Sequence, residues 1–140
     1  VEIIENKAIA TPVAMHHIHL FVPDPLAAQA WYAKHFGAVA GKRGRFDTAT
    51  VPGGEFTLAK EEKPQASTKG RSVDHIGFEV KDIDAFAKKL QADGVQIEAP
   101  GMRTSPNASR LHLFYIMDPW GTYIEITNGL PPAPEQSASR

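Results

Sequence analysis

Two stretches of the sequence, His17-Ile-His-Leu-Phe-Val-Pro-Asp24 and His75-Ile-Gly-Phe-Glu-Val-Lys-Asp82, align with each other without a gap. Along both stretches the residues alternate with the period of two that is typical of a half-buried strand. One face of the strand carries His17, His19 and Phe21 in the first stretch and His75, Gly77 and Glu79 in the second. A helical pattern follows each stretch, so the sequence predicts a duplicated unit.

The residues after each stretch predict a helix with defined ends. Asp24 and Asp82 are expected to be the N-caps, with Pro25 at the first helical position. Gly37 and Gly94 are expected to end the two helices. The faces expected to point inward are Leu26, Ala30 and Ala33 in the first helix and Ile83, Phe86 and Leu90 in the second.

Short strands are expected after each helix, at 38–45, 47–52 and 55–60 in the first unit and at 95–100, 111–117 and 122–128 in the second. Each unit therefore reads β-α-β-β-β. The predicted fold class is α+β, with two tandem βαβββ modules that form a curved mixed sheet around a cavity and carry their helices outside. The paired histidines are expected to point into this cavity.

A single domain is expected over 14–128, after an N-terminal extension at 1–13. Its modules cover about 14–62 and 73–128, and a polar linker at 63–72 joins them. The segment 129–140 is rich in Pro, Ser and Ala and is expected to be a flexible tail. The chain begins with Val1, which fits a trimmed chain or a mature form that has lost a signal peptide. We favour the mature form. The sequence leaves the compartment open between cytoplasmic and exported.

The composition favours a small-molecule substrate as the partner. The chain has 140 residues, of which 42% are hydrophobic and 22% charged, and its net charge is -1. This charge gives no basis for binding nucleic acid or an anionic membrane, because both require clustered Lys and Arg. The tight basic cluster of Lys42, Arg43 and Arg45 is expected to be a solvated strand end. The chain has no cysteine, which excludes disulfides and thiolate metal sites.

Three residues form a candidate metal site. His17 and His75 hold the same place in the two repeats, and Glu125 lies between two isoleucines near the end of the last strand. A carboxylate in such an apolar strand is costly to bury alone, and a cation compensates its charge. Two neutral imidazoles and one carboxylate suit a divalent ion with open coordination positions. The sequence predicts one such ion, which is Fe, Mn, Zn or Ni.

The motifs of the chain resemble those of the vicinal oxygen chelate superfamily. The matching stretches are Met15-His-His-Ile-His-Leu-Phe-Val-Pro-Asp24 with Trp31-Tyr32 and Phe36-Gly37, Val73-Asp-His-Ile-Gly-Phe-Glu-Val80, and Phe114-Tyr-Ile-Met-Asp-Pro-Trp-Gly-Thr-Tyr-Ile-Glu-Ile126. The superfamily includes glyoxalase I, bleomycin-resistance proteins, fosfomycin-modifying enzymes, methylmalonyl-CoA epimerases and extradiol dioxygenases. The resemblance implies paired βαβββ modules, a metal in the cavity and frequent homodimers. It also implies that the metal chelates substrate oxygens and acts as a Lewis acid.

The resemblance does not select one activity. Glyoxalase I and the epimerases usually take a further metal ligand from the last strand of the first module. In this chain that strand has Thr57 or Leu58 opposite Glu125, and Glu55 could be the ligand only if the strand register slips by a residue or more. This difference argues against both activities. Members with two His and one Glu remain, and Tyr115 matches a tyrosine that they place beside the metal. The fosfomycin enzymes carry basic residues after the last ligand, and none precedes Arg140 here.

The extradiol dioxygenases carry an acid-base histidine in the loop before the tyrosine. The histidine available here, His112, is too close to Tyr115 in the sequence for that match.

Other residues are candidates for chemistry or substrate binding. His19 shares the face of His17, so it is expected to act as an acid-base group, a hydrogen-bonding partner of a ligand or a substituting ligand. Arg103 and Arg110, in a loop expected over the cavity mouth, are candidates for binding an anionic substrate group, and Thr57 is a candidate substrate contact.

The first hypothesis is therefore a metal-dependent enzyme, a lyase, isomerase or dioxygenase, that acts on a small oxygen-rich organic molecule, with Tyr115 and His19 as catalytic residues. The alternative is a metal-free binding protein of the bleomycin-resistance type, in which a dimer sequesters an aromatic ligand. Trp31, Phe46, Trp120 and Tyr123 would supply its aromatic surface. The complete ligand set disfavours this alternative.

Overall fold

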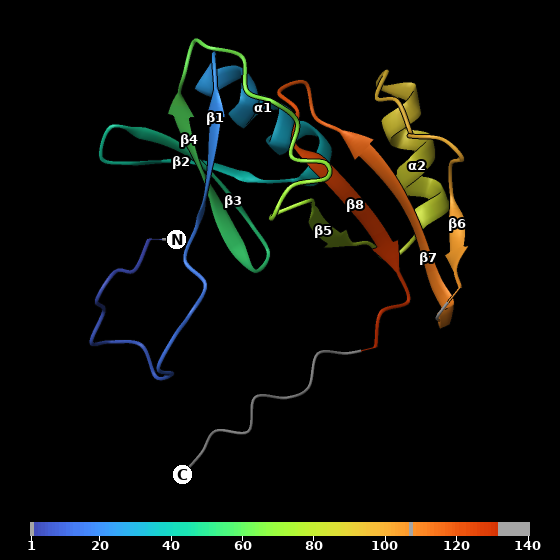
Figure 1. The fold of residues 1–140 in the computed structure, drawn as a ribbon, viewed down its shortest axis with the longest axis horizontal. Helices are drawn as coiled ribbons and strands as arrows, with labels where there is room; N and C mark the ends of the chain where they lie inside the picture. The colour runs from blue at the N-terminus through green and yellow to red at the C-terminus, as the bar shows by residue number, and fades with distance from the viewer. Residues whose placement is uncertain (1, 107, 132–140) are drawn as a thin grey trace. The chain divides into compact units, whose positions relative to one another are not determined.

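A computed structural model describes residues 2–106 and 108–131, and in these residues two units, divided between Pro64 and Gln65, each hold one helix and four strands (Figure 1). Unit 1 contains β1 (Ile18–Val22), α1 (Pro25–Phe36), β2 (Val39–Arg43), β3 (Phe46–Val51) and β4 (Gly54–Lys60). Unit 2 contains β5 (Ile76–Glu79), α2 (Ile83–Ala92), β6 (Arg103–Ser105), β7 (Ala108–Met117) and β8 (Tyr123–Asn128). The predicted α+β class and the βαβββ order of both modules are confirmed.

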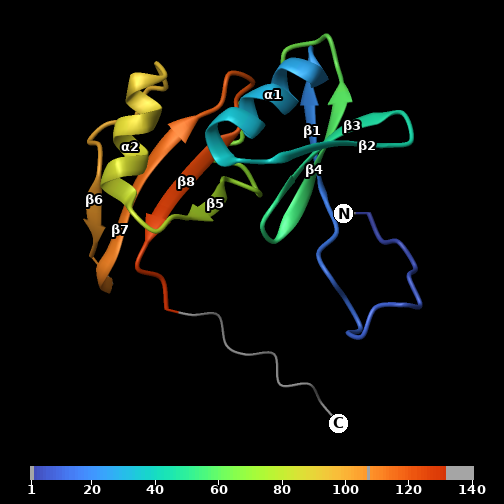
Figure 2. The ribbon, with the colours of Figure 1, turned by 180° about the vertical axis from the view of Figure 1, so that it is seen from behind.

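Each unit has its own mixed four-stranded sheet. The strand orders are β1-β4-β3-β2 and β5-β8-β7-β6, in which the first pair is parallel and the others antiparallel (Figure 2). The register matches between the units, because His19 pairs with Thr57 in unit 1 and Gly77 pairs with Glu125 in unit 2. Thr57, rather than Leu58, is therefore the counterpart of Glu125.

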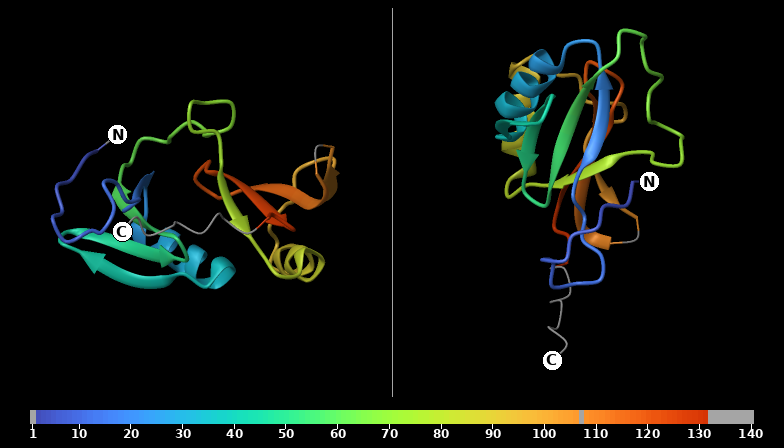
Figure 3. Two further views of the ribbon diagram at one scale, coloured as in Figure 1. Left: turned by 90° about the horizontal axis from the view of Figure 1, so that it is seen from below. Right: turned by 90° about the vertical axis from the view of Figure 1, so that its left-hand side faces the viewer.

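The core of unit 1 lies between α1 and one face of its sheet (Figure 3). Tyr32 of α1 is fully buried and packs on Phe56 of β4, with 4.8 Å between the ring centroids. The buried residues of α1 are Ala28, Tyr32 and His35, so the prediction of Leu26, Ala30 and Ala33 was wrong. Leu26 is 61% exposed. Alanines occur all around this helix, so the large ring of Tyr32 decides which face is buried.

The core of unit 2 lies between α2 and β8. Ile83 and Leu90 are buried as predicted, whereas Ala87 rather than Phe86 completes the inward face. The sheet contributes Phe114, Ile116, Ile124 and Ile126, all fully buried.

The helix ends agree with the caps expected from the sequence. The side chain of Asp24 accepts hydrogen bonds from the backbone N–H groups of Leu26 and Ala27, at 3.1 and 3.0 Å. Asp82 accepts from Ala85 at 2.9 Å. Gly37 caps α1 with a φ of 67°, which a residue without a Cβ adopts at no steric cost.

The strand expected at 95–100 was wrong. Ile97 forms only an isolated bridge to Ile116, and the N–H of Gly101 donates to the carbonyl of Glu98 at 2.8 Å, closing a turn. Pro100 and Gly101 end the extended segment, and the third strand of the module starts after them as β6. The loop expected to carry Arg103 and Arg110 is therefore the β6–β7 hairpin.

The described part of the N-terminal extension, 2–13, forms no helix or strand and is exposed. Most of the tail predicted at 129–140 lies outside the described residues, which end at 131. Neither α1 nor α2, the helices of the described ranges, is long and apolar enough to cross a membrane.

Candidate functional site

Two of the predicted metal ligands lie side by side in unit 2. His75 directly precedes β5, which pairs in parallel with β8, the strand that carries Glu125. Nε2 of His75 is 3.0 Å from Oε2 of Glu125. Two donors with bonds of about 2.0–2.2 Å to one ion lie roughly 3 Å apart when the angle between them is near 90°, as in octahedral coordination, so this pair fits one ion. The side chain of Glu125 is only 18% exposed, and a bound cation offsets the cost of burying its charge.

The second ring nitrogen of His75 is held by Asp74. Nδ1 of His75 lies 2.8 Å from Oδ1 of Asp74, and the N–H of Gly70 donates to the other carboxylate oxygen. The hydrogen bonds from His75 and Gly70 lower the pKa of Asp74, so its ionised carboxylate accepts the Nδ1 proton. Nε2 then keeps its lone pair on the side of Glu125, an arrangement common at metal-binding histidines. Sequence reasoning missed Asp74, although an acid next to a candidate ligand was a usable signal.

Tyr115 lies beside Glu125 on the neighbouring strand, β7. Its O–H donates to Oε1 of Glu125 at 2.9 Å. Burial, together with this hydrogen bond, raises the pKa of Tyr115 to about 12. The phenol is therefore protonated at neutral pH and acts as a donor to the carboxylate.

Aromatic and basic groups extend this cluster. Tyr115 and Tyr123 stack with 4.8 Å between ring centroids, and the Arg103 guanidinium lies 5.1 Å from the centre of the Tyr115 ring. The O–H of Tyr123 donates to Glu98, and burial followed by this bond raises the pKa of Tyr123. Arg110 and Tyr115 both lie on β7 and are an odd number of positions apart, so their side chains point to opposite faces of the sheet. The structure thus groups Arg103, but not Arg110, with Tyr115.

In unit 1, His17 directly precedes β1 and His19 lies within it, with 4.7 Å between their ring centroids. Glu2 approaches both, because its Oε2 is 3.2 Å from Nε2 of His17 and 4.0 Å from Nε2 of His19. Within residues 2–106 and 108–131, this is the one group of at least three His, Asp or Glu residues whose ligand atoms lie within 4.8 Å of one another. Sequence reasoning missed Glu2, because a long stretch without a strand or helix pattern separates it from His17.

Arg43 is part of the same region. Its guanidinium donates to the hydroxyl of Thr57 and lies 3.4 Å from Oε1 of Glu55. The expectation that Arg43 belongs to a solvated strand end was wrong, because its side chain is half-buried. Strand β2, which carries Arg43, pairs with β3, and β3 pairs with β4, so the side chain reaches Thr57 on β4. The predicted substrate contact Thr57 is itself buried and accepts this hydrogen bond.

The protonation state of His17 suits metal binding. Burial, followed by the positive charge of Arg43 and the neighbouring His19, lowers the pKa of His17. The ring is therefore neutral at physiological pH, with a lone pair available to a cation.

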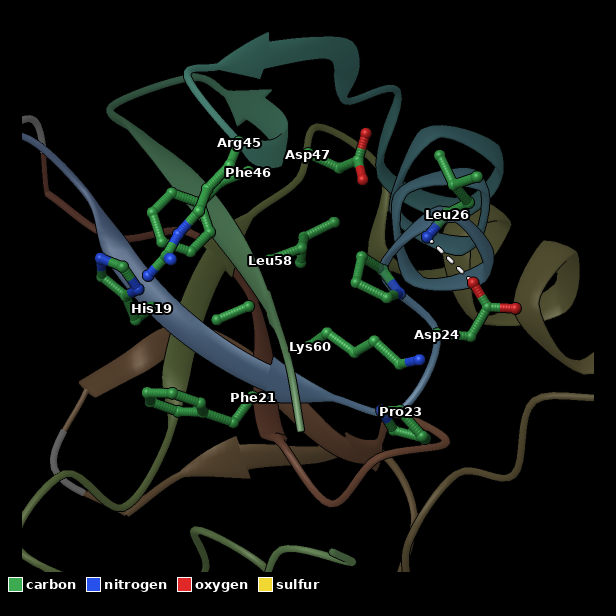
Figure 4. Close-up of a pocket in the computed structure, with 12 residues that line it drawn as sticks. His19, Phe21, Pro23, Asp24, Leu26, Arg45, Phe46, Asp47, Leu58 and Lys60 are labelled. Carbon is green, nitrogen blue, oxygen red and sulfur yellow. Dashed lines mark hydrogen bonds between the residues drawn. The ribbon is translucent and has the colours of Figure 1, made fainter. Parts of the chain in front are cut away.

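A cavity of about 940 Å³ lies in unit 1 next to His19 (Figure 4). Its aromatic walls are Phe21, which is 52% exposed, and Phe46, whose ring meets His19 edge-on at 5.6 Å. Arg45 lies over the Phe46 ring at 4.9 Å, and Lys60 lines the opposite side. Asp24 and Asp47 also line the cavity and balance the two basic groups. The volume is within the range of small-molecule sites, and the aromatic walls suit a planar group.

Equivalent positions of the two modules carry different side chains. Thr57 and Glu125 are counterparts by register, and so are His19 and Gly77. A Cβ at Gly77 would lie 4.0 Å from Oε2 of Glu125, which is ordinary van der Waals contact. Unit 2 therefore carries a His–Glu pair at these positions, and unit 1 carries a His-x-His pair.

Comparison with known proteins identifies the family. The model of the Glyoxalase/Bleomycin resistance protein/Dioxygenase superfamily matches residues 14–126. The chain belongs to this superfamily. The resemblance drawn from the sequence motifs is confirmed.

Solved structures of the superfamily share its fold. A genomically encoded fosfomycin resistance protein, FosX, from Listeria monocytogenes is 19% identical, with a TM-score of 0.71 over 86% of this chain and 96% of that protein. Lactoylglutathione lyase from Agrobacterium tumefaciens is 23% identical, with a TM-score of 0.61 over 84% and 95%. A superfamily member from Sphaerobacter thermophilus DSM 20745 is 20% identical, with a TM-score of 0.65 over 83% and 97%. No curated protein sequence matches the chain.

The predicted site residues therefore fall into two groups. His75, Glu125, Tyr115 and Arg103 come together in unit 2, while His17 and His19 lie together in unit 1. The ligand set of His17, His75 and Glu125 takes residues from both units and stays a prediction.

Proposed function

We propose that this superfamily member is a metal-dependent enzyme that acts on a small oxygen-rich organic molecule, and that His17, His75 and Glu125 hold its single divalent ion. The observation that carries the proposal is the 3.0 Å approach of the His75 and Glu125 ligand atoms, with Asp74 fixing the other nitrogen of His75. When bound, such an ion acts as a Lewis acid that polarises a substrate oxygen and stabilises negative charge on it.

The ligand set favours an open coordination site. Thr57 stands where unit 2 has Glu125, and its hydroxyl is already bonded to Arg43. With three protein ligands, positions remain for two substrate oxygens, as at catalytic rather than structural metal sites. Chelation of a substrate at such an ion serves a lyase, an isomerase or a dioxygenase, and the proposal covers all three reaction classes.

Other residues of the chain have roles that follow from their contacts. Tyr115, as a protonated donor to Glu125, holds the carboxylate in place and is positioned to donate to a developing oxyanion. His19 lines the cavity of unit 1 and is the acid-base candidate for substrate bound there. Arg103, which lies over the Tyr115 ring, binds an anionic substrate group. The protein works as a homodimer.

Metal analysis of protein purified without affinity metals tests the proposal. We expect close to one ion per chain in the wild type and its loss in His75→Ala and Glu125→Gln. The matched control is His112→Ala. His112 lies on β7, but strand alternation places it on the other sheet face from Tyr115, where it lies 3.4 Å from the Thr104 hydroxyl. Full metal occupancy in both ligand variants, or no uptake by the wild type on titration, would contradict the proposal.

A further inference from the structure

We propose that Glu2, His17 and His19 form a second divalent-cation site that lies entirely within unit 1, with its carboxylate supplied by the N-terminal segment. This inference goes beyond the proposed function and does not rest on it. Glu2 belongs to a segment without regular structure, His17 directly precedes β1, and His19 lies within β1.

The distances among the ligand atoms are close to those of a tetrahedral site. Two ligands bonded to Zn²⁺ at about 2.0–2.2 Å lie roughly 3.3–3.5 Å apart when the angle between them is tetrahedral. Oε2 of Glu2 is 3.2 Å from Nε2 of His17, just below this range. The distance to Nε2 of His19, 4.0 Å, requires a shift of a few tenths of an ångström, which an exposed carboxylate can make. The side chain of Glu2 is 62% exposed.

The arrangement of the two histidines supports the same conclusion. Residues separated by two positions on a strand point to the same side, and β1 pairs with β4, which fixes the direction of the strand. His19 is held further by edge-on contact with Phe46. A rigid pair of imidazoles that meets a mobile carboxylate is a suitable ligand set for Zn²⁺ or a similar borderline ion.

Arg43 is connected to this group through His16, whose Nδ1 is 2.9 Å from the guanidinium and 2.8 Å from Nδ1 of His17. The guanidinium also lies 3.4 Å from Glu55, which offsets part of its charge. The carboxylate of Glu2 supplies the negative charge that a cation at His17 and His19 needs beside this arginine.

The two ligand sets share His17 and exclude each other at that residue. One Nε2 atom binds one ion, so an ion held with Glu2 and His19 is not held with His75 and Glu125.

Zn²⁺ binding measured by competition with a chromophoric chelator tests this site separately from the proposed catalytic centre. The double variant His75→Ala/Glu125→Gln should lose its ion during purification, but we expect it still to bind added Zn²⁺ on titration, more weakly than the wild type. Adding Glu2→Gln should weaken this binding by at least about 10-fold, the smallest effect typical of losing even an outer partner of a metal site. Glu5→Gln is the matched control, because Glu5 lies on the same segment and approaches only Lys7, at 3.9 Å.

If the double variant fails to fold, the single variant Glu125→Gln, which lacks the competing carboxylate ligand, still decides the question. Co²⁺ bound with Glu2 and His19 should shift the His19 ring protons in NMR spectra, and Glu2→Gln should remove the shift while Glu5→Gln keeps it. Equal affinities in the Glu2 and Glu5 variants, or unshifted His19 protons, would overturn the proposal. Loss of binding in His75→Ala or Glu125→Gln with no effect of Glu2→Gln would leave the proposed function intact and remove only this second site.

Discussion

Thr57 and Glu125 hold the same position in their sheets, but only Glu125 carries a charge. Its neighbours are arranged around that charge. Tyr115 donates to one carboxylate oxygen, and His75 approaches the other. In unit 1 the same backbone register presents a hydroxyl bonded to Arg43. Identical backbone geometry thus supports different chemistry, because the side chain and its hydrogen-bond partner decide whether a site attracts a cation.

Asp74→Asn should weaken metal binding without changing the ligand set. The carboxylate orients His75 through Nδ1, and loss of such a partner costs about 10–100-fold in metal affinity. We expect this loss in a chelator competition measurement, with an unchanged melting temperature of the metal-free protein. Asp84→Asn, an exposed acid in the first turn of α2, is the control. Equal affinities in the two variants would show that Asp74 does not position His75.

Glu125→Gln should lower the pKa of Tyr115 from about 12 towards its ordinary value of 10.0, because the variant removes the charged acceptor. The raised pKa means that folding favours the protonated phenol. The raised pKa of Tyr115 therefore stabilises the folded state fully below pH 10, and this stabilisation is lost as the pH rises through about 12. Tyrosinate absorbance of the metal-free protein measures this transition, and Tyr115→Phe identifies it. An unchanged midpoint in the glutamine variant would rule out Glu125 as a cause.

Among single residues, the sequence identifies candidate site residues only where they belong to a repeated pattern. His17, His75 and Glu125 were recognisable because they occur in motifs of alternating residues. Asp74, Arg43 and Glu2 were missed or misjudged, since their importance comes from hydrogen bonds and pairing that no local pattern records. Glu2 is the extreme case, because only the path of the irregular N-terminal segment brings it to His17.

At the scale of elements, the start of α1 depends on Asp24. Its carboxylate accepts two of the free N–H groups at the helix N-terminus. Asp24→Ala should therefore lower the free energy of unfolding by about 1 kcal/mol. Urea denaturation measures this change. Asp24→Asn is the matched control and should stay close to the wild type, since asparagine caps equally well. A similar loss in both variants would mean that the negative charge, rather than the cap, stabilises the helix.

The helices and most strands could be predicted because caps and alternation are local signals. The buried face of α1 could not, since a helix rich in alanine has no distinct apolar stripe and the packing of Tyr32 on Phe56 decides it. The strand at 95–100 failed for a related reason. Its residues favour a strand, but only Ile97 forms a bridge to β7, and the turn that the Gly101 N–H closes ends the extended segment.

At the scale of the whole molecule, the proposed ligand set makes metal binding a property of both units. An ion held by His17, His75 and Glu125 must stabilise unit 1 and unit 2 together, whereas an ion held by Glu2, His17 and His19 acts on unit 1. Each unit contains one of the two tryptophans of the chain, Trp31 in unit 1 and Trp120 in unit 2. Fluorescence can therefore follow each unit separately.

Adding metal at a free concentration of 100 times the Kd should raise the free energy of unfolding by about 2.7 kcal/mol, if the ion binds only the native state. In Trp120→Phe the remaining Trp31 reports unit 1, and in Trp31→Phe the remaining Trp120 reports unit 2. We expect the same increase from both reporters with Glu125 present, and its loss from the unit 2 reporter Trp120 in Glu125→Gln. An increase seen by Trp31 alone would place the ion on the Glu2 set. Because that outcome removes His75 and Glu125 from the bound state, it would contradict the proposed catalytic centre while leaving the metal site of unit 1 in place.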